Sequence, residues 1–504
     1  MNTQPIPELE IDFTENVGPL RPELHSSGLG GQLVGSASGR TGLLKPLHFF
    51  AARTHDWALV NAGQRMIDTH FVFPNPKADP ENPDNYFFGP TDEILSQTTQ
   101  DLGLRVLYRM GTSIESVNAR RDWNDPDAPK PGYYNCIEPD DWNHYANVLS
   151  HIIRHYTEGW NGGFHWRDHM RYWELWNEPN DRPGGSWLAA DRNFDKEHNF
   201  ARFRGFFTTV LKKLKTEFPD LKFGGPAVCY PDTKYLQELL RACKEAGYAP
   251  DFVSWHNYGC RPDDMLKTPA KMRALCDGLG FPETELVIDE WHYLPYPEAW
   301  GDFSAPPERF ARLVDPINGL TGIESAVYTL QTFCGLQETC LDQSYWYGCN
   351  PNPGALWGIF HADGSPNKEY FAAKLFGTVV AACDRRAQTV DWDPRNPIQA
   401  YGYLSRDGKR KYVIVSRFKG GPIEFQVRIR GLGSLQPVSC LVLDRFHDLD
   451  EALDSDPTAK SYGNVSRTPF SPTVASPVFL RPDEETFVFR IWDPASSAYL
   501  IAFE

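Results

Sequence analysis

The chain has 504 residues, which is too long for one hydrophobic core and predicts two or more domains. Its composition is that of a globular protein, with 41% hydrophobic and 23% charged residues, and no apolar run approaches membrane-spanning length. The formal net charge of −16 argues against nucleic acid as a partner. We therefore expect a soluble protein with no nucleic-acid or membrane partner; whether it forms a homo-oligomer is left open.

The amino-terminal residues and the cysteines bear on the compartment. Residues Met1 to Glu8 show neither the basic start nor the apolar stretch of a secretory signal, so the sequence as it stands predicts a cytoplasmic protein. A periplasmic or secreted protein whose signal has been removed would have the same sequence. Ten cysteines lack the pairwise spacing of metal sites. Cys334, Cys340 and Cys349 could be bridged in an oxidising compartment, although free buried thiols are the favoured interpretation.

Residues 45–380 alternate between strand-like and helix-like stretches, which predicts an α/β fold, a parallel (β/α)8 or TIM barrel. The expected strands are 47–56, 69–73, 104–111, 172–176, 221–225, 252–258, 285–289 and 324–330. The expected helices begin near Thr91 and Pro139 or span 203–218, 235–246 and 367–379. The proline-rich stretch 74–86 is long for a connection in such a barrel, and long connections often carry function.

The sequence pattern changes after the last expected helix. From Gln388 onward, short runs of alternating apolar and polar residues are separated by turns, as in 411–416, 424–429 and 486–492. This pattern is typical of an antiparallel β-sandwich. We therefore expect residues 381–504 to form an accessory β-sandwich domain beside the barrel.

One strand end stands out as a catalytic candidate. Tyr172–Trp176 is an aromatic and aliphatic run that favours a buried strand, and Asn177-Glu178-Pro179-Asn180 ends it. A carboxylate at the carboxyl end of a barrel strand occupies the position of catalytic groups. A solvated Glu at a strand end is the plainer interpretation, and a second carboxylate at a later strand end is needed to outweigh it.

That second carboxylate follows three strands later. The apolar run Glu285–Ile288 ends in Asp289-Glu290-Trp291, and about three strand–helix units fit between Glu178 and Glu290. Two carboxylates at one rim of a barrel can face each other across its mouth. The strand-like run 252–258 lies between them and also ends in polar and aromatic residues.

These motifs resemble those of the retaining glycoside hydrolases with a (β/α)8 barrel, and more narrowly glycoside hydrolase family 39, the β-xylosidase and α-L-iduronidase family. The matching residues are Arg53-Thr54-His55, Trp176–Asn180, Lys222–Ala227, Trp255–Tyr258 and Asp289–Trp291. The resemblance implies that Glu178 is the general acid/base and Glu290 the nucleophile of a double displacement that needs no cofactor. It also implies that residues 1–44 contribute to a β-domain beside the barrel.

Further residues are expected to contact the sugar. Asn177 would bind the 2-hydroxyl, with a turn-capping role as the alternative, and Tyr258 would hold Glu290 by a hydrogen bond. The remaining expected contacts are His55, His256, Trp255, Trp291 and Trp357. A core position is the alternative for each histidine, and core packing is equally favoured for Trp255 and Trp291. Arg53 is expected to support the carboxylates rather than to touch substrate.

Three competing interpretations are less favoured. Glu174, four residues before Glu178, is a rival acid, but on a strand it would point the same way from deeper in the barrel. A metal site among the histidines and carboxylates lacks the usual ligand spacing, so no metal is expected. A carbohydrate-binding protein without activity is disfavoured because both carboxylates are present.

The expected activity is removal of one terminal sugar, with β-D-xylosidase as the default implied by the family. Family 39 β-xylosidases carry a Trp in strand eight followed by two acidic residues, whereas the stretch expected here reads Tyr328–Phe333, with Glu338 as the one acid beyond. Trp346 or Trp357 would then supply the missing surface. Enzymes acting on α-L-arabinopyranosides, β-galactosides or β-glucosides stay open. We expect 74–86 and 340–357 to enclose a pocket; an open groove would favour endo action.

Overall fold

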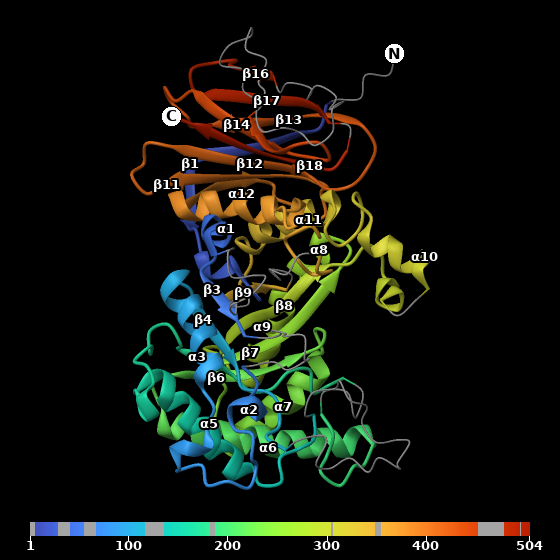
Figure 1. Cartoon of the computed structure of the whole chain (residues 1–504). Coiled ribbons are helices and arrows are strands. Elements are labelled where there is room, and N and C mark those ends of the chain that lie inside the picture. The colour runs from blue at the N-terminus through green and yellow to red at the C-terminus, as the bar shows by residue number, and fades with distance from the viewer. Residues whose placement is uncertain are drawn as a thin grey trace.

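The computed structural model describes residues 6–28, 41–54, 67–115, 136–181, 187–303, 306–347, 354–451, 478–493 and 495–504. A closed barrel ringed by helices lies against a large β-sheet, with α11 (Ile323–Leu336) and α12 (Lys368–Ala382) between them (Figure 1). This confirms the expected fold class, a TIM barrel with an accessory antiparallel β-sandwich domain. None of the helices within the described ranges combines the length and the apolar character needed to span a bilayer.

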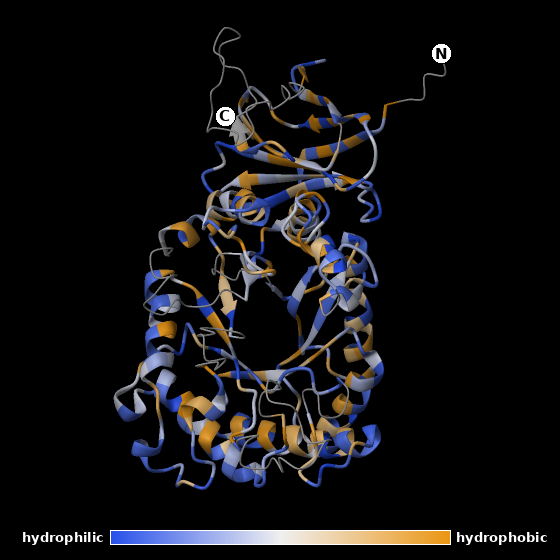
Figure 2. Ribbon diagram, turned by 45° about the vertical axis from the view of Figure 1, so that its right-hand side comes forward, coloured by the Kyte–Doolittle hydropathy of each residue, from blue (hydrophilic) through white to orange (hydrophobic). Residues whose placement is uncertain are grey.

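Eight parallel strands close the barrel in chain order. They are β2 (Ser26–Ser27), β3 (Ala51–Arg53), β4 (Arg105–Arg109), β5 (Tyr172–Glu174), β6 (Lys222–Val228), β7 (Phe252–Gly259), β8 (Glu285–Tyr293) and β9 (Gln343–Trp346). Their side chains alternate between the interior and the surrounding helices. Figure 2 shows the strands around the barrel axis and the helices outside them.

The outer helices begin and end at sequence signals of the usual kinds. They are α1 (Thr41–Leu44), α2 (Thr69–Val72), α3 (Gly89–Ser96), α5 (Trp142–Thr157), α6 (Lys196–Glu217), α7 (Thr233–Ala246), α8 (Pro262–Leu266), α9 (Thr268–Leu279), α10 (Pro307–Phe310), α11 (Ile323–Leu336) and α12 (Lys368–Ala382). The side chains of Asp141, Asp195 and Asn367 accept hydrogen bonds from the first-turn amides of α5, α6 and α12. Gly247 ends α7 with a φ of 77°, which a residue with a Cβ rarely adopts.

The first part of the barrel differs from the sequence prediction in two ways. The first strand is β2, and the stretch 47–56 contributes β3, the second strand. The stretch 69–73, predicted to be a strand, forms the single turn of α2. Tyr108 Oη donates to the carbonyl of Ile67 at 2.8 Å, and Arg109 pairs with Asp68, so β4 fixes this segment beside its carboxyl end. These long-range contacts outweigh the strand preference of the β-branched and aromatic residues.

The prediction of strand eight was also wrong. Residues 324–330 belong to α11, and the eighth strand is β9. Helix α11 is buried on all sides apart from Glu324, because it lies between the barrel and the β-sheet. A short apolar run on such a helix has no polar face and cannot be told from a buried strand by its periodicity.

The accessory domain is a ten-stranded mixed sheet that folds over its own apolar core. Its strands, in spatial order, are β15 (Asp448–Glu451), β14 (Pro437–Leu443), β18 (Ser497–Phe503), β12 (Lys411–Arg417), β11 (Ile398–Ser405), β10 (Cys383–Val390), β1 (Glu8–Pro19), β13 (Ile423–Arg430), β17 (Thr486–Asp493) and β16 (Val478–Leu480). The amino-terminal strand β1 is parallel to β13 and antiparallel to β10. Residues 1–44 therefore supply strands to both the sheet and the barrel.

The sheet rests on α11 and α12, which lie side by side beneath it (Figure 1). Gln331 of α11 donates through Nε2 to the carbonyl of Pro397 at 3.1 Å and to Ser416 Oγ at 3.2 Å. Glu338, which follows α11, pairs with Arg386 of β10. The acid that the sequence analysis placed near the sugar thus joins the two domains instead.

Arg21 ties the link between β1 and β2 to the carboxyl end of α11. Its guanidinium donates to the carbonyl oxygens of Leu336, Gln337, Thr339 and Leu341 at 2.7 to 3.0 Å. The last carbonyls of a helix lack partners within the helix and attract cations. Arg21 therefore completes α11 and fixes the segment that enters the barrel.

We predict that Arg21→Ala lowers the free energy of unfolding by about 2–4 kcal/mol, because charged hydrogen bonds to four carbonyls are lost. Thermal and urea denaturation measure the change. Arg395→Ala is the matched control, since this arginine is 75% exposed and pairs with Asp393 at the surface. The control is expected to unfold like the unaltered chain. Equal losses in the two variants would contradict the anchoring role of Arg21.

Candidate active site

The segment beyond β5 holds Glu178 in a strained conformation. Trp176 and Glu178 have φ values of 80° and 50°, and Ala227 beside them has 57°, all in the left-handed region that non-glycine residues rarely adopt. The Glu178 amide donates to the carbonyl of Ala227 at 2.8 Å. Strain of this kind costs about 1–3 kcal/mol per residue and persists where surrounding contacts enforce it. The direction of the Glu178 side chain, which is 31% exposed, is thereby fixed.

Glu290 lies near the carboxyl end of β8 and is held on both oxygens. Tyr258 Oη donates to Oε1, and Arg53 Nη1 donates to Oε2 at 3.3 Å. The side chain is 8% exposed, so it is accessible only from the mouth of the barrel. The expected hydrogen bond from Tyr258 is therefore present in the structure.

His256 lies between the two carboxylates. Its Nδ1 is 2.9 Å from Glu178 Oε1, and its Nε2 is 3.4 Å from Asp289 Oδ2 and 3.6 Å from Glu290 Oε2. One oxygen from each glutamate and one nitrogen of His256 all lie within 4.8 Å of one another. The tertiary structure thus brings Glu178 and Glu290 close enough for one reacting atom of a substrate to lie between them.

Arg53 organises the floor of this site. Its Nε donates to Glu174 Oε2 at 2.7 Å, and its Nη2 donates to Asn177 Oδ1 at 2.7 Å and lies 3.0 Å from Asp289 Oδ2. Burial alone would lower the pKa of Arg53, but Glu174, Asp289 and Glu290 raise it, so the guanidinium stays charged. Arg53 supports the carboxylates as expected, and Glu174 is fully buried beneath them, as expected for the rival acid.

The buried carboxyl groups around Arg53 differ in the direction of their pKa shifts. Burial raises the pKa of Glu174 to about 7 despite the adjacent Arg53. Burial also acts to raise the pKa of Asp289, but Arg53 and His256 together bring it below the usual value. Glu174 thus takes up a proton more readily than Asp289 near neutral pH, which limits the negative charge beneath the site.

The triad of Glu178, His256 and Glu290 also has the proximity needed to bind a metal ion. Burial acts to lower the pKa of His256, but Glu290, Asp289 and the hydrogen bonds to Asp289 and Glu178 raise it well above the usual value. A doubly protonated imidazole has no lone pair to offer a metal, so a metal ion would have to displace a proton from His256.

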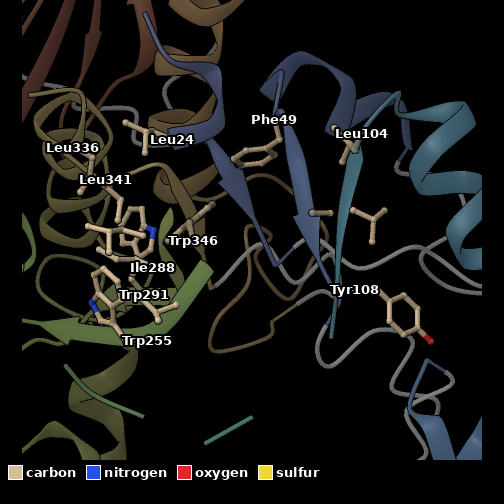
Figure 3. Close-up of a cluster of buried hydrophobic side chains, with 14 of the residues drawn as sticks. Leu24, Phe49, Leu104, Tyr108, Trp255, Ile288, Trp291, Leu336, Leu341 and Trp346 are labelled. Carbon is tan, nitrogen blue, oxygen red and sulfur yellow. The ribbon is translucent and has the colours of Figure 1, made fainter. Parts of the chain in front are cut away.

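The other expected substrate contacts fall into three groups. Asn177 lies at the mouth, and its Oδ1 accepts a hydrogen bond from Arg53. Its side-chain NH2 group is therefore the part suited to a sugar hydroxyl. Trp255 and Trp291 are fully buried, and Trp291 Nε1 donates to Ser344 Oγ at 2.7 Å, so neither can stack on a sugar. Figure 3 shows both within the apolar core beside β8. His55 lies outside the described residues.

Trp357 does lie at the mouth, within an aromatic wall that the sequence analysis did not find. Its ring stacks on Phe303 with 5.2 Å between centroids and is 5.8 Å from Tyr258. Trp300 completes the wall, 4.9 Å from the Tyr258 ring. The signal in the sequence was the stretch Pro295–Trp300 directly after β8, at the end of the strand that carries Glu290.

Of the two segments that were expected to enclose the pocket, one lies at the mouth of the barrel and the other does not. The segment after β9 contributes Tyr347 and Trp357 to the mouth. The loop 74–86 packs on the outer helices instead: Tyr86 contacts Trp160 edge-on, and Glu81 lies 3.4 Å from His151 of α5. Its apolar side chains are therefore satisfied outside the barrel, and the prediction that it walls the pocket was wrong. Cys334 and Cys340 are free thiols, and Cys349 lies outside the described residues.

Known proteins resemble this chain both in part of its sequence and in its fold. Residues 128–272 match the family model for glycosyl hydrolases family 39. A β-xylosidase of Geobacillus stearothermophilus is 27% identical over 178 residues, which cover 31% of this chain and 32% of the relative. The aligned part thus spans about a third of the curated relative.

Solved structures share the fold over the whole chain. A glucosidase from Croceicoccus marinus superposes with a TM-score of 0.70 at 20% identity, covering 99% of both chains. AbfB, a family 51 α-L-arabinofuranosidase from Bifidobacterium longum, superposes with a TM-score of 0.60 at 14% identity, covering 100% of both. At these identities the likeness is one of fold.

The parallel barrel with two glutamates close together at its carboxyl end is similar to the arrangement in glycoside hydrolases. Within that class, the family model and the curated relative support family 39.

We predict that His256 keeps both ring protons to a higher pH than an ordinary histidine does, because Glu290 and Asp289 stabilise its charge. Nitrogen chemical shifts of labelled histidine measure this by NMR. His292 is the internal control, since burial lowers its pKa to about 4 and keeps it neutral. Glu290→Gln removes the largest stabilising charge and should lower the pKa of His256. A neutral His256 at pH 7 in the unaltered protein would contradict this electrostatic arrangement.

Proposed function

We propose that this protein is a retaining exo-glycosidase that removes one terminal sugar by double displacement. The observation that carries the proposal is the pair Glu178 and Glu290, whose nearest oxygens lie within 4.8 Å. Retaining enzymes place their carboxyl groups about 5–5.5 Å apart, whereas inverting enzymes leave room for a water at about 6.5–9.5 Å. The short separation supports retention.

In the first step, Glu178 protonates the glycosidic oxygen while a carboxylate oxygen of Glu290 bonds to the anomeric carbon. The bond to the leaving group breaks, and its electron pair stays on the newly protonated oxygen. Because Glu178 Oε1 faces His256, the other oxygen is the one suited to carry the proton outward. Arg53 and Tyr258 hold Glu290 in line for attack.

In the second step, Glu178 takes a proton from water, whose oxygen bonds to the anomeric carbon. The ester bond to Glu290 breaks, and its electron pair restores the carboxylate, which Arg53 and Tyr258 again stabilise. No cofactor is needed for either step.

For the substrate we propose a β-D-xyloside, which rests on the resemblance to family 39 and on the curated relative. The sequence argument against xylose used residues 328–333, which lie in α11. The true eighth strand, β9, does end in a Trp, Trp346, although that ring is fully buried and stacks on His292. No acid follows it before Asp363. α-L-arabinopyranosides, β-galactosides and β-glucosides therefore belong in the same test.

We predict that NMR of the first product shows the anomeric configuration of the substrate, because two inversions restore it. An inverted first product would mean that Glu290 is not the nucleophile.

Glu290→Gln should lower kcat by about four orders of magnitude or more. Azide should restore turnover of substrates with good leaving groups to Glu178→Ala, because azide replaces the water that this base activates. If the protein binds sugars without hydrolysing them, none of these three experiments will detect turnover.

We predict that, in a panel of p-nitrophenyl glycosides, the β-xyloside gives the highest kcat/KM and oligosaccharides release monosaccharide. A site fitted to a sugar without a C6 hydroxymethyl group discriminates against hexosides by steric conflict. The matched comparison is β-glucoside with β-xyloside, which differ only in that group. Faster turnover of another glycoside would contradict the substrate assignment but not the roles assigned to Glu178 and Glu290. Release of products longer than a monosaccharide would favour endo action.

A further inference from the structure

Trp300 differs from the other aromatic residues at the mouth in its exposure. It lies in the short helical turn Ala299–Asp302 after β8, and its side chain is 51% exposed. Tyr258 donates a hydrogen bond to Glu290. Trp357 is enclosed by Phe303, Tyr347 and His292. Trp300 is thus the outermost ring of the wall.

A chain of contacts connects Trp300 to the reacting centre. Glu290 accepts a hydrogen bond from Tyr258, and the edge-to-face contact between Tyr258 and Trp300 has 4.9 Å between centroids. Trp300 is also 5.4 Å from Phe303 and 6.1 Å from Trp357. These neighbours fix the indole at the rim while leaving a large part of its surface uncovered.

The position of Trp300 decides which part of a substrate it can meet. The anomeric carbon must lie between Glu178 and Glu290, and Glu290 is reached only from the mouth. In an exo-acting pocket the terminal sugar is innermost, and the group being displaced lies toward solvent. A half-exposed ring at the rim therefore faces the displaced group rather than the terminal sugar.

We propose that Trp300 forms the leaving-group subsite, a platform on which the flat apolar face of a sugar ring or an aryl group stacks. This inference rests on the proposed glycosidase function and adds to it the chemistry of the displaced group. Aromatic faces hold flat ligands by dispersion and by removal of apolar surface from water. The platform selects for ring-shaped leaving groups and makes no demand on their hydroxyl pattern.

The test compares two substrates of the same sugar and anomeric configuration. One is the p-nitrophenyl glycoside, whose leaving group can stack on Trp300; the other is the glycosyl fluoride, whose leaving group has no ring. Trp300→Ala should lower kcat/KM for the p-nitrophenyl glycoside about tenfold, mainly through KM, and leave kcat/KM for the fluoride unchanged. Trp300→Phe should restore most of the loss because it restores a stacking face.

Trp492→Ala is the matched control, since Trp492 is 53% exposed on β17 of the accessory sheet and should affect neither substrate. Equal losses on both substrates would place the effect of Trp300 on the terminal sugar or on folding and would overturn the subsite. No loss on either substrate would also overturn it. Failure of the unaltered protein to turn over even the fluoride would overturn the proposed function itself, so the two failures are distinguishable.

Discussion

One buried guanidinium sets the conditions for the whole mouth of the barrel. Arg53 extends from β3 and contacts Glu174 at the end of β5, Asn177 beyond it, and both Asp289 and Glu290 on β8. Taking an ion out of water costs several kcal/mol, so three buried carboxylates around one cation are stable only when their positions are fixed together. The strands of the barrel fix them, and the loss of Arg53 would leave the buried carboxylates without this compensating charge.

The rim stores strain above this buried network. The left-handed backbone at Trp176, Glu178 and Ala227 is enforced by tight packing: a Cβ on Gly225 would lie 2.9 Å from the carbonyl oxygen of Leu175. A carboxylate held in this way does not reorient during reaction, which is the condition for electrostatic preorganisation. The accessory sheet contributes indirectly, by holding α11 and, through Arg21, the segment that carries the first strand.

The errors of the sequence analysis share a physical origin. Residues 324–330 read as a strand because α11, apart from Glu324, is buried and so lacks a polar face. Residues 69–73 read as a strand because of their composition, but contacts from Tyr108 and Arg109 hold the segment as a helical turn. Trp255 and Trp291 looked as suitable for sugar as for the core, because an aromatic residue at a strand end gives no sign of which face it takes. In each case the deciding contact comes from a distant part of the chain.

The sequence by itself determined the alternation of strands and helices, the change to an antiparallel sheet, and the strand ends that carry Glu178, Tyr258 and Glu290. Local preferences and short motifs contain that information, because strand periodicity and strand-ending prolines act over a few residues. Only the tertiary structure decided that His256 bridges the two glutamates and that Trp300 and Trp357 meet at the mouth. The reason is that these side chains come from different strands and loops, and their proximity and their shared charge arise only when the barrel closes.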